Sequence, residues 1–187
     1  IIASPLNTAA DALYVRYREK LCRYEPDTRH PDDQPIDPSG ATIGVFGMGR
    51  IGTMAYDFLR EKYGETVIGV DFDNQKVSEH ADAGRRVVFG APTDPDFWAR
   101  VIRPETKARM VLLTMSQHRA NLAAVRHLVD VGFPGGIAAI AQFDDQVQEL
   151  REAGAHAAFN FYNEAGLGFA EHAWEILEET YQPEAVS

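Results

Sequence analysis

The glycine-rich segment 41–52, ATIGVFGMGRIG, constrains the fold of this chain more than any other stretch. An apolar run ends in the pattern Gly47-x-Gly49-x-x-Gly52, and a helical pattern of apolar residues follows at once. Glycines at such a strand-to-helix turn permit a tight turn, close approach of the backbone to a pyrophosphate, and close packing of the helix. The start of the helix also presents free N–H groups to an anion. The segment therefore predicts a nucleotide-phosphate site, with a purely structural turn as the alternative.

A second apolar run, residues 66–70, ends at Asp71. This aspartate follows Gly52 at close to the spacing of about 20 residues at which an acidic side chain hydrogen-bonds a ribose hydroxyl in dinucleotide-binding folds. A carboxylate there repels a 2′-phosphate. We therefore expect NAD, AMP or ATP to bind in preference to NADP.

Composition excludes several classes of function. The 187-residue chain is 45% hydrophobic and has a formal net charge of −10, so it offers no electrostatic footprint for nucleic acid or an anionic membrane. Cys22 is the only cysteine, which rules out an intrachain disulfide and fits a reducing compartment. No run of about 18 apolar residues and no signal peptide is present. Because the first residue is Ile1 rather than Met, we expect a piece of a longer protein.

Two segments precede the glycine turn. Residues 8–24 predict a basic helix with an imperfect apolar stripe, which we expect to dock on its own domain or on a second subunit; a membrane surface is the alternative. Residues 25–40 are rich in proline and aspartate and predict a linker or extended arm. The expected domains are therefore 1–40, a helix and linker, and 41–187, a nucleotide-binding domain.

From residue 41 onward, strand and helix patterns alternate. Helix 50–63 is expected to bury Ile51, Met54, Ala55, Phe58 and Leu59, and Asp73 or Asn74 caps the helix after the second strand. The predicted strands are 42–47, 66–71, 86–90, 108–114, 137–141 and 155–159, and the helices are 50–63, 74–83, a short helix between Asp94 and Pro104, 117–131, a helix capped by Asp144 that stops at Gly154, and 164–180. This alternation predicts an α/β fold, a Rossmann-like doubly wound parallel sheet of six strands in the order 3-2-1-4-5-6.

In such a sheet the ligand lies beyond the carboxyl ends of the strands, between the first and the fourth. Arg50 is the basic side chain of the turn and is expected to contact phosphate, although a solvated arginine is the alternative. Asp73 is either a ligand contact or only a helix cap. Ser116 and Gln142 also lie at strand ends. The predicted cofactor-binding residues are Gly47, Met48, Gly49, Arg50, Ile51, Gly52, Asp71, Phe72, Asp73, Pro92, Thr93, Thr114 and Met115.

Catalytic groups are not apparent in the sequence. The six histidines form no metal-binding spacing, and we predict neither a metal site nor catalytic residues. His118 lies nearest the expected crevice. No G-x-S-x-G pattern is present, and after the sixth strand only one helix and a short tail remain. A dehydrogenase needs a further domain to bind its substrate, so we predict a protein that is not an enzyme.

Several motifs resemble the regulatory nucleotide-binding domain of potassium transporters and channels, called RCK-N, KTN or TrkA-N. They are the turn 45–52, the run 67–71, Gly90-x-x-Thr93, the pair Asn121-Leu122, and the segment 149–155. Among the subgroups, the chain is most similar to the cytoplasmic domain of Kef-type glutathione-regulated potassium efflux systems.

The resemblance implies a soluble, homodimeric domain on the cytoplasmic face of a membrane. Such a domain binds NAD(H), AMP or another adenine nucleotide and regulates a transmembrane potassium efflux or antiporter part, in the same chain or in a separate subunit. Gly47, Gly49, Arg50 and Gly52 would hold phosphates and Asp71 the ribose.

The chain departs from the family pattern in two places. Members commonly have Gly-Asp-Ala-Thr after the third strand, where this chain has Gly90-Ala91-Pro92-Thr93. Kef members carry arginines near the end of the fifth strand, where this chain has Ile140 and Gln142. The alternatives to a nucleotide-sensing regulator are a fragment of an NAD-dependent oxidoreductase and a dimeric scaffold that binds no nucleotide.

Overall fold

The computed structural model describes residues 40–94, 97, 98, 101 and 107–180. All of them belong to one compact unit of the chain, residues 35–187. The predicted helix 8–24, nearly all of the linker 25–40, and most of the short helix between Asp94 and Pro104 lie outside the described residues.

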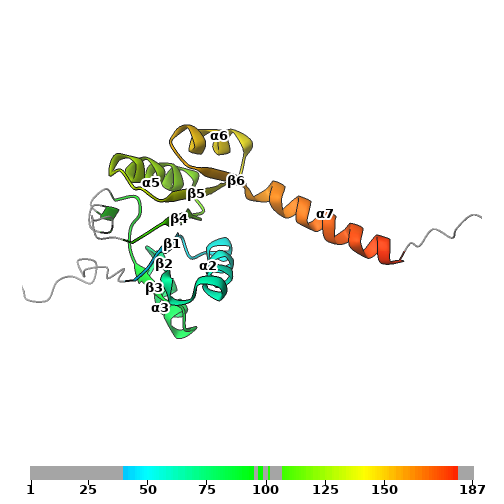
Figure 1. Cartoon of the computed structure of the whole chain (residues 1–187), viewed down its shortest axis with the longest axis horizontal. Helices are drawn as coiled ribbons and strands as arrows, with labels where there is room; N and C mark the ends of the chain where they lie inside the picture. The colour runs from blue at the N-terminus through cyan, green and yellow to red at the C-terminus, as the bar shows by residue number, and fades with distance from the viewer. Residues whose placement is uncertain (1–39, 95–96, 99–100, 102–106, 181–187) are drawn as a thin grey trace, which may run out of the picture. The chain divides into compact units, whose positions relative to one another are not determined.

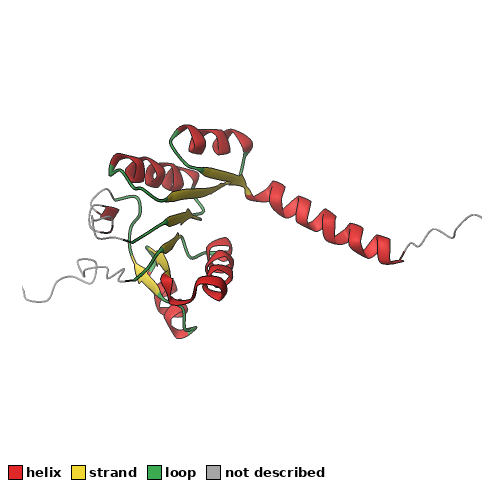
Figure 2. Cartoon of the chain, viewed as in Figure 1, coloured by secondary structure: helices red, strands yellow, loops and turns green. Residues whose placement is uncertain are grey.

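A parallel sheet of six strands forms the centre of the fold, in the order β3-β2-β1-β4-β5-β6 (Figures 1 and 2). The predicted Rossmann-like architecture and strand order are confirmed. The strands are β1 (Ile43–Phe46), β2 (Val67–Asp71), β3 (Val87–Phe89), β4 (Met110–Leu113), β5 (Gly136–Ala141) and β6 (Ala157–Asn160). The helices are α2 (Arg50–Tyr63), a 3-10 turn η3 (Gly64–Thr66), α3 (Asn74–Asp82), α5 (His118–Asp130), α6 (Asp144–Glu152) and α7 (Phe161–Thr180).

The ends of the helices follow local chemistry. Gly64, with a positive φ of 61°, follows the last residue of α2 as predicted. Asp73 caps α3 because its carboxylate accepts hydrogen bonds from the backbone N–H groups of Gln75 and Lys76. The sequence predicts Asp144 as the N-cap of the helix that stops at Gly154, and this prediction is wrong. Asp144 lies inside the first turn of α6, where its carboxylate accepts from the side-chain amides of Asn160 and Asn163.

Alternate residues of each strand point to opposite faces of the sheet, and each face has its own apolar core. On one face Ile43 and Val45 pack with Tyr56 of α2. On the other face Phe46 packs with Phe97, Trp98 and residues of α5 and α6. The sheet is therefore covered by α2 and α3 on one side and by α5 and α6 on the other, as Figure 1 shows.

The predicted buried face of helix 50–63 is partly wrong. Met54 and Phe58 are 74% and 56% exposed, whereas Gly52 and Tyr56 are buried. Gly52 faces the turn and the sheet at the start of the helix, which brings Tyr56, one turn later, over β1 and β2. Met54 and Phe58 therefore lie on the solvent side.

Helix α7 continues directly from β6 (Figure 2). Its large apolar side chains are exposed, including Leu167, Phe169, Trp174, Ile176 and Leu177. Among the described residues, no helix has both the length and the apolar character needed to cross a lipid bilayer.

Candidate functional site

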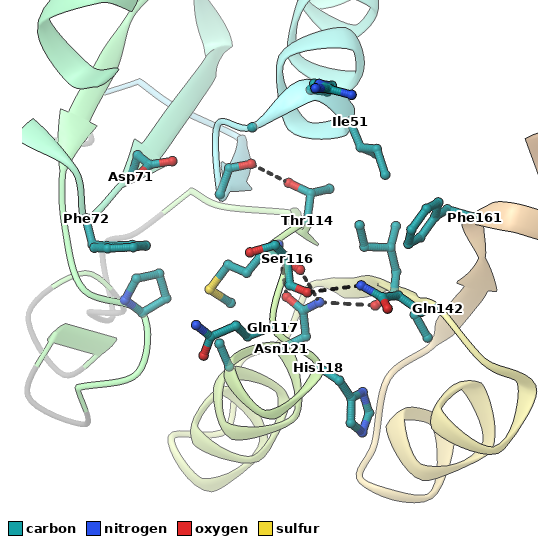
Figure 3. A pocket seen from close by; sticks show the side chains of 18 of the residues that line it. Ile51, Asp71, Phe72, Thr114, Ser116, Gln117, His118, Asn121, Gln142 and Phe161 are labelled. Carbon is teal, nitrogen blue, oxygen red and sulfur yellow. Dashed lines mark hydrogen bonds between the residues drawn. The ribbon is translucent and has the colours of Figure 1, made fainter. Parts of the chain in front are cut away.

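A cavity of about 740 Å³ opens where the carboxyl ends of the strands meet the following helices (Figure 3). This volume lies in the range of small-molecule and cofactor sites, roughly 300–1,000 Å³. The position is the one at which open α/β sheets bind ligands, beside the point where the strand order reverses. Its walls come from the segments that follow β1, β2, β3, β4 and β5, together with the start of α7, so one ligand can contact segments that lie far apart in the sequence.

The lining residues form two groups from different parts of the chain. We call one group the turn half, made of Gly47, Gly49, Arg50, Ile51, Asp71, Phe72, Lys76, Ala91, Pro92 and Thr93. We call the other the amide half, made of Ser116, Gln117, His118, Ala120, Asn121, Ile140, Ala141, Gln142, Gln146, Phe161 and Tyr162. Thr114 and Met115 lie between them.

The glycines of the turn have distinct roles. Gly47 has a φ of 94°, a conformation that residues with a side chain rarely adopt. A Cβ atom on Gly52 would lie 2.0 Å from the carbonyl oxygen of Gly47 and 2.7 Å from Oγ1 of Thr114. A Cβ atom on Gly49 would meet nothing within 4 Å. Gly47 and Gly52 therefore shape the turn, and Gly49 leaves space in front of it.

Two side chains fix the turn, one at the end of β2 and one directly after β4. The hydroxyl of Thr114 lies 2.9 Å from the carbonyl oxygens of both Phe46 and Gly47. Asp71 is 3% exposed, and its Oδ2 accepts a 2.8 Å hydrogen bond from the N–H of Met48. Its Oδ1 accepts one from the N–H of Asp73 at 3.0 Å. A carboxylate offers about four acceptor sites, so Asp71 keeps capacity for a ligand hydroxyl.

The segment after β3 forms the outer wall of the turn half. Phe72, which follows β2, is 66% exposed and lines the same cavity as Pro92. The carbonyl of Pro92 accepts a 2.7 Å hydrogen bond from Nε1 of Trp98, a fully buried side chain. Trp98 in turn packs on Phe46 and Phe97 at ring-centroid distances of 4.8 and 5.1 Å. The segment is thus held from beneath by an aromatic cluster rather than by an aspartate.

Two cations line the turn half. Arg50 is exposed at the first position of α2, and Lys76 is half-buried on α3. Neither forms an ion pair with any other residue that the structure describes. Since Asp71 is the acidic residue of this lining, the turn half combines positive charge with a hydrogen-bond acceptor.

The amide half is polar but carries no lysine, arginine, aspartate or glutamate among its lining residues. Asn121 is 1% exposed and shapes this end, because its side chain bonds to the N–H and C=O of Met115 and to the C=O of Ile140. The amide of Gln142 lies 3.5 Å from the carbonyl of Ser116. Figure 3 shows Gln142 and Phe161 on the same wall of the cavity.

His118 points away from the middle of the cavity (Figure 3). Its Nε2 lies 2.8 Å from a carboxylate oxygen of Glu149, so it links α5 to α6. Its Nδ1 is buried without a hydrogen-bond partner among the described residues. Nor do the described residues contain a cluster of three or more His, Cys, Asp or Glu side chains that could hold a metal ion.

Most of the residues predicted to bind the cofactor do line this cavity. They are Gly47, Gly49, Arg50, Ile51, Asp71, Phe72, Pro92, Thr93, Thr114 and Met115. The side chain of Met48 lies in the core, Gly52 packs against the turn, and Asp73 caps α3, so these three support the cavity from behind. Prediction from sequence missed Lys76, Gln117, Ala120, Gln146, Phe161 and Tyr162. Phe161 follows directly after β6, so the rule of strand ends would have found it had the strand been placed one residue further.

A parallel sheet in this order, with a glycine turn and an acidic residue ending the second strand, defines a Rossmann-type fold. Residues 43–161 match the family model described as the TrkA-N domain. The chain belongs to the TrkA-N family.

One curated relative is the "Putative K(+) efflux antiporter KefB" of Alkalimonas amylolytica. It is 30% identical over 135 residues, which cover 72% of this chain and 20% of the relative. The chain therefore spans about a fifth of the length of that protein.

Solved structures share the fold. The NAD(P)-binding domain of an exopolyphosphatase-related protein from Archaeoglobus fulgidus superposes with a TM-score of 0.65 at 24% identity, covering 72% of this chain and 98% of that one. The GsuK channel bound to NAD superposes with a TM-score of 0.53 at 22% identity, covering 82% of this chain and 26% of that one.

Proposed function

We propose that this chain is a regulatory domain that binds an adenine nucleotide and thereby controls a potassium efflux or cation–proton antiport system. The observation that carries the proposal is the cavity in which the glycine turn, the carboxylate of Asp71 and the exposed ring of Phe72 meet. The relative named as an antiporter supports the link to ion transport. Because the chain spans a fifth of that relative, the transmembrane part would be supplied by a longer chain or a separate subunit.

In this proposal, the turn half binds the phosphates, the ribose and the adenine of the ligand at different residues. Its phosphates lie against the start of α2, where Arg50 supplies positive charge and the first backbone N–H groups lack helical partners. Its ribose hydroxyls donate to Asp71. Its adenine lies on Phe72, with Pro92 and Thr93 on the other side and Thr114 and Met115 along the floor.

The amide half favours a dinucleotide, NAD(H), over AMP. A second nucleoside that carries a neutral carboxamide matches walls made of amide, hydroxyl and aromatic side chains. AMP would leave this half empty. Glutathione is anionic and would find no arginine or lysine in this half, so we propose no glutathione site here.

Binding would act on the transporter through the shape of the domain. Phe161 and Tyr162, the first residues of α7, line the cavity, so a bound nucleotide touches the helix that leaves the sheet. A ligand shifts a conformational equilibrium only by the difference in its affinity for the two states. Regulation therefore requires a nucleotide that contacts α7 in one state more closely than in the other.

We also propose that the domain is a homodimer on the cytoplasmic face of the membrane. The exposed apolar residues of α7 support self-association, because contiguous apolar surface in a soluble protein usually marks an interface. Light scattering coupled to size exclusion would test this, with Trp174→Glu as the variant expected to shift a dimer to a monomer. A monomeric wild-type domain would contradict it.

Catalysis is the competing function, as a fragment of an NAD-dependent oxidoreductase. The histidine nearest the site, His118, is paired with Glu149 and directed away from the cavity, which disfavours it as a catalytic acid or base. Hydride transfer from NADH to any added substrate by the purified chain would overturn the regulatory proposal.

Thermal unfolding with NAD, NADH, AMP, ATP and NADP tests nucleotide binding. We expect stabilisation by the ligands with an unmodified ribose, about 2.7 kcal/mol at a concentration of 100 times Kd, and none by NADP. Gly49→Asp provides the matched control. The new carboxylate enters open space at the N-cap of α2, where it stabilises the helix but repels phosphate. Stabilisation of wild type by none of these ligands would leave the non-binding scaffold as the better interpretation.

A further inference from the structure

The side chain, the N–H and the carbonyl oxygen of Met48, in the glycine turn, all contact other residues of the domain. Its side chain is 2% exposed in the core, and its N–H donates to Asp71 at 2.8 Å. Its carbonyl oxygen lies 2.9 Å from Nε2 of His80, a half-buried residue in the last turn of α3. The hydroxyl of Thr53 donates to the same oxygen at 3.3 Å. The proposed nucleotide contacts do not involve His80, so its bond to the turn needs an explanation.

The chemistry of this contact fixes the proton. A carbonyl oxygen can only accept, so Nε2 of His80 must carry the hydrogen. At 2.9 Å the imidazole is also closer than the hydroxyl of Thr53. Thr53 belongs to α2 and follows the turn directly, whereas His80 lies 32 residues away on α3. His80 is therefore the tie between the turn and a different helix.

The orientation of the peptide groups follows from these bonds. A trans peptide is planar, so the carbonyl of one residue and the N–H of the next point in opposite directions. No cis peptide occurs among the described residues. The carbonyl of Gly47 points to Thr114, and the N–H of Met48 points to Asp71. In the next peptide plane the carbonyl of Met48 points to His80, so the N–H of Gly49 must point away from His80.

The N–H of Gly49 donates to none of the described residues, and Gly49 lines the cavity with open space in front of it. We infer that His80 is a positioning residue for nucleotide binding: by holding the carbonyl of Met48, it keeps the N–H of Gly49 directed at the ligand phosphate. This inference rests on the proposed nucleotide function. It assigns His80 an indirect role in phosphate binding, because the ligand itself does not contact this histidine.

The test is the affinity of the chain for AMP and for adenosine, which differ by the phosphate alone. Wild type and His80→Ala are titrated with each ligand by NMR or calorimetry. Losing one hydrogen bond that orients a donor is expected to weaken AMP binding about fivefold to tenfold and to leave adenosine binding within about twofold. His80→Gln, whose side-chain N–H can donate to the same oxygen, is expected to restore AMP affinity, and His80→Met, which cannot donate, is not.

Arg85→Ala is the matched control. Arg85 hydrogen-bonds Asp57 of α2 from the segment just after α3, but its side chain does not contact Met48. The control should lower the melting temperature slightly and leave AMP affinity unchanged. If His80→Ala fails to fold, the His80→Gln and His80→Met pair decides the question.

Two results would overturn the inference while leaving the proposed function intact. One is equal AMP affinity in wild type, His80→Ala and His80→Met. The other is an equal loss of AMP and adenosine affinity, which would indicate a general structural role for His80. Failure of wild type to bind AMP or NAD at all would instead overturn the proposed function, and this inference with it.

Discussion

The turn half and the amide half of the cavity are built by different means. In the turn half the backbone of the glycine turn forms part of the wall, and buried side chains such as Asp71 and Thr114 fix that turn through hydrogen bonds. In the amide half the wall consists of side chains, among them Gln142 and Phe161, above a turn that Asn121 holds. Under the proposed function, the turn half would bind the part that AMP and NAD share, with Asp71 discriminating against NADP. The side chains of the amide half would distinguish NAD from AMP.

The largest effect is expected at Gly52. Gly52→Ala places a methyl group 2.0 Å from the carbonyl of Gly47, a backbone atom that cannot rotate away. We expect a loss of about 3 kcal/mol in the free energy of unfolding, measured by urea denaturation. Gly49→Ala is the control in the same turn. Because its methyl group meets open space, it should leave stability within about 0.5 kcal/mol of wild type. Equal stability of the two variants would refute the idea that the turn wall is rigid.

Asp71 comes next, because it serves both the turn and the ligand. Asp71→Asn has one side-chain oxygen in place of two, while Met48 and Asp73 both donate to the carboxylate. An amide N–H would then face a backbone N–H, at a cost of about 1–3 kcal/mol in stability. We expect AMP and NAD affinity to fall about tenfold or more, measured by calorimetry. Unchanged affinity would remove Asp71 from the ligand site.

Substitutions of Phe72 and Gln142 test whether the two halves of the cavity contribute differently to AMP and NAD binding. Phe72→Ala removes an exposed ring and should weaken AMP and NAD equally, by about twofold to tenfold. Gln142→Ala should weaken NAD about threefold and leave AMP unchanged. The measurement is the ratio of NAD to AMP affinity in each variant. A Gln142→Ala variant that loses both ligands equally would show that the amide half does not select the nucleotide.

The smallest effect is expected at the Asp57–Arg85 pair, which links α2 to the segment after α3 and does not line the cavity. Asp57 accepts from Arg85 at 2.7 and 2.8 Å, and this hydrogen bonding lowers the pKa of the Asp57 carboxyl, against the opposing effect of partial burial. The folded-state pKa is therefore below the unfolded one, so the stabilisation is present at neutral pH and is lost as the pH falls below about 4.

Asp57→Asn should accordingly lower stability by about 0.5 kcal/mol or less at pH 7, since the Asp57 side chain is 48% exposed and solvent screens the pair. The difference from wild type should shrink towards pH 3 in thermal unfolding. If the stability difference between wild type and Asp57→Asn grew on acidification, the pKa of Asp57 would not be lowered by folding.

Short-range patterns explain why the fold could be predicted from the sequence. Apolar runs of strand length that alternate with capped helices predict the sheet order, since right-handed crossovers leave few alternatives. Which residues of α2 are exposed was harder to predict from the sequence. The sequence pattern groups Met54 and Phe58 with Leu59, which packs on the core. Gly52 and Tyr56 are buried instead of Met54 and Phe58, because the turn fixes the rotation of the helix. That rotation depends on a three-dimensional contact between Gly52 and Gly47, which no period in the sequence displays.

The candidate site divides in the same way. Residues of the turn half could be predicted because their spacing from the glycines carries the information. In the amide half, Ser116 and Gln142 could be placed from strand ends, and Phe161 was missed because β6 ends one residue later than predicted. Gln146 lies within α6 and reaches the cavity through three-dimensional placement. His80 offers no sequence pattern either. Its contact with Met48 spans 32 residues and involves a backbone oxygen, which carries no residue identity.

The two tryptophans give the protein two separable optical reporters. Trp98 is fully buried and bonded to the carbonyl of Pro92 beneath the cavity, whereas Trp174 is 61% exposed on α7. Emission from the buried indole lies at shorter wavelength and resists collisional quenchers, while the exposed one is accessible to them. Trp174→Phe leaves fluorescence that follows the wall of the cavity, and Trp98→Phe leaves fluorescence that follows α7. Occupancy of the cavity and burial of the helix can thus be recorded as separate events without a label, each in its own single-tryptophan variant.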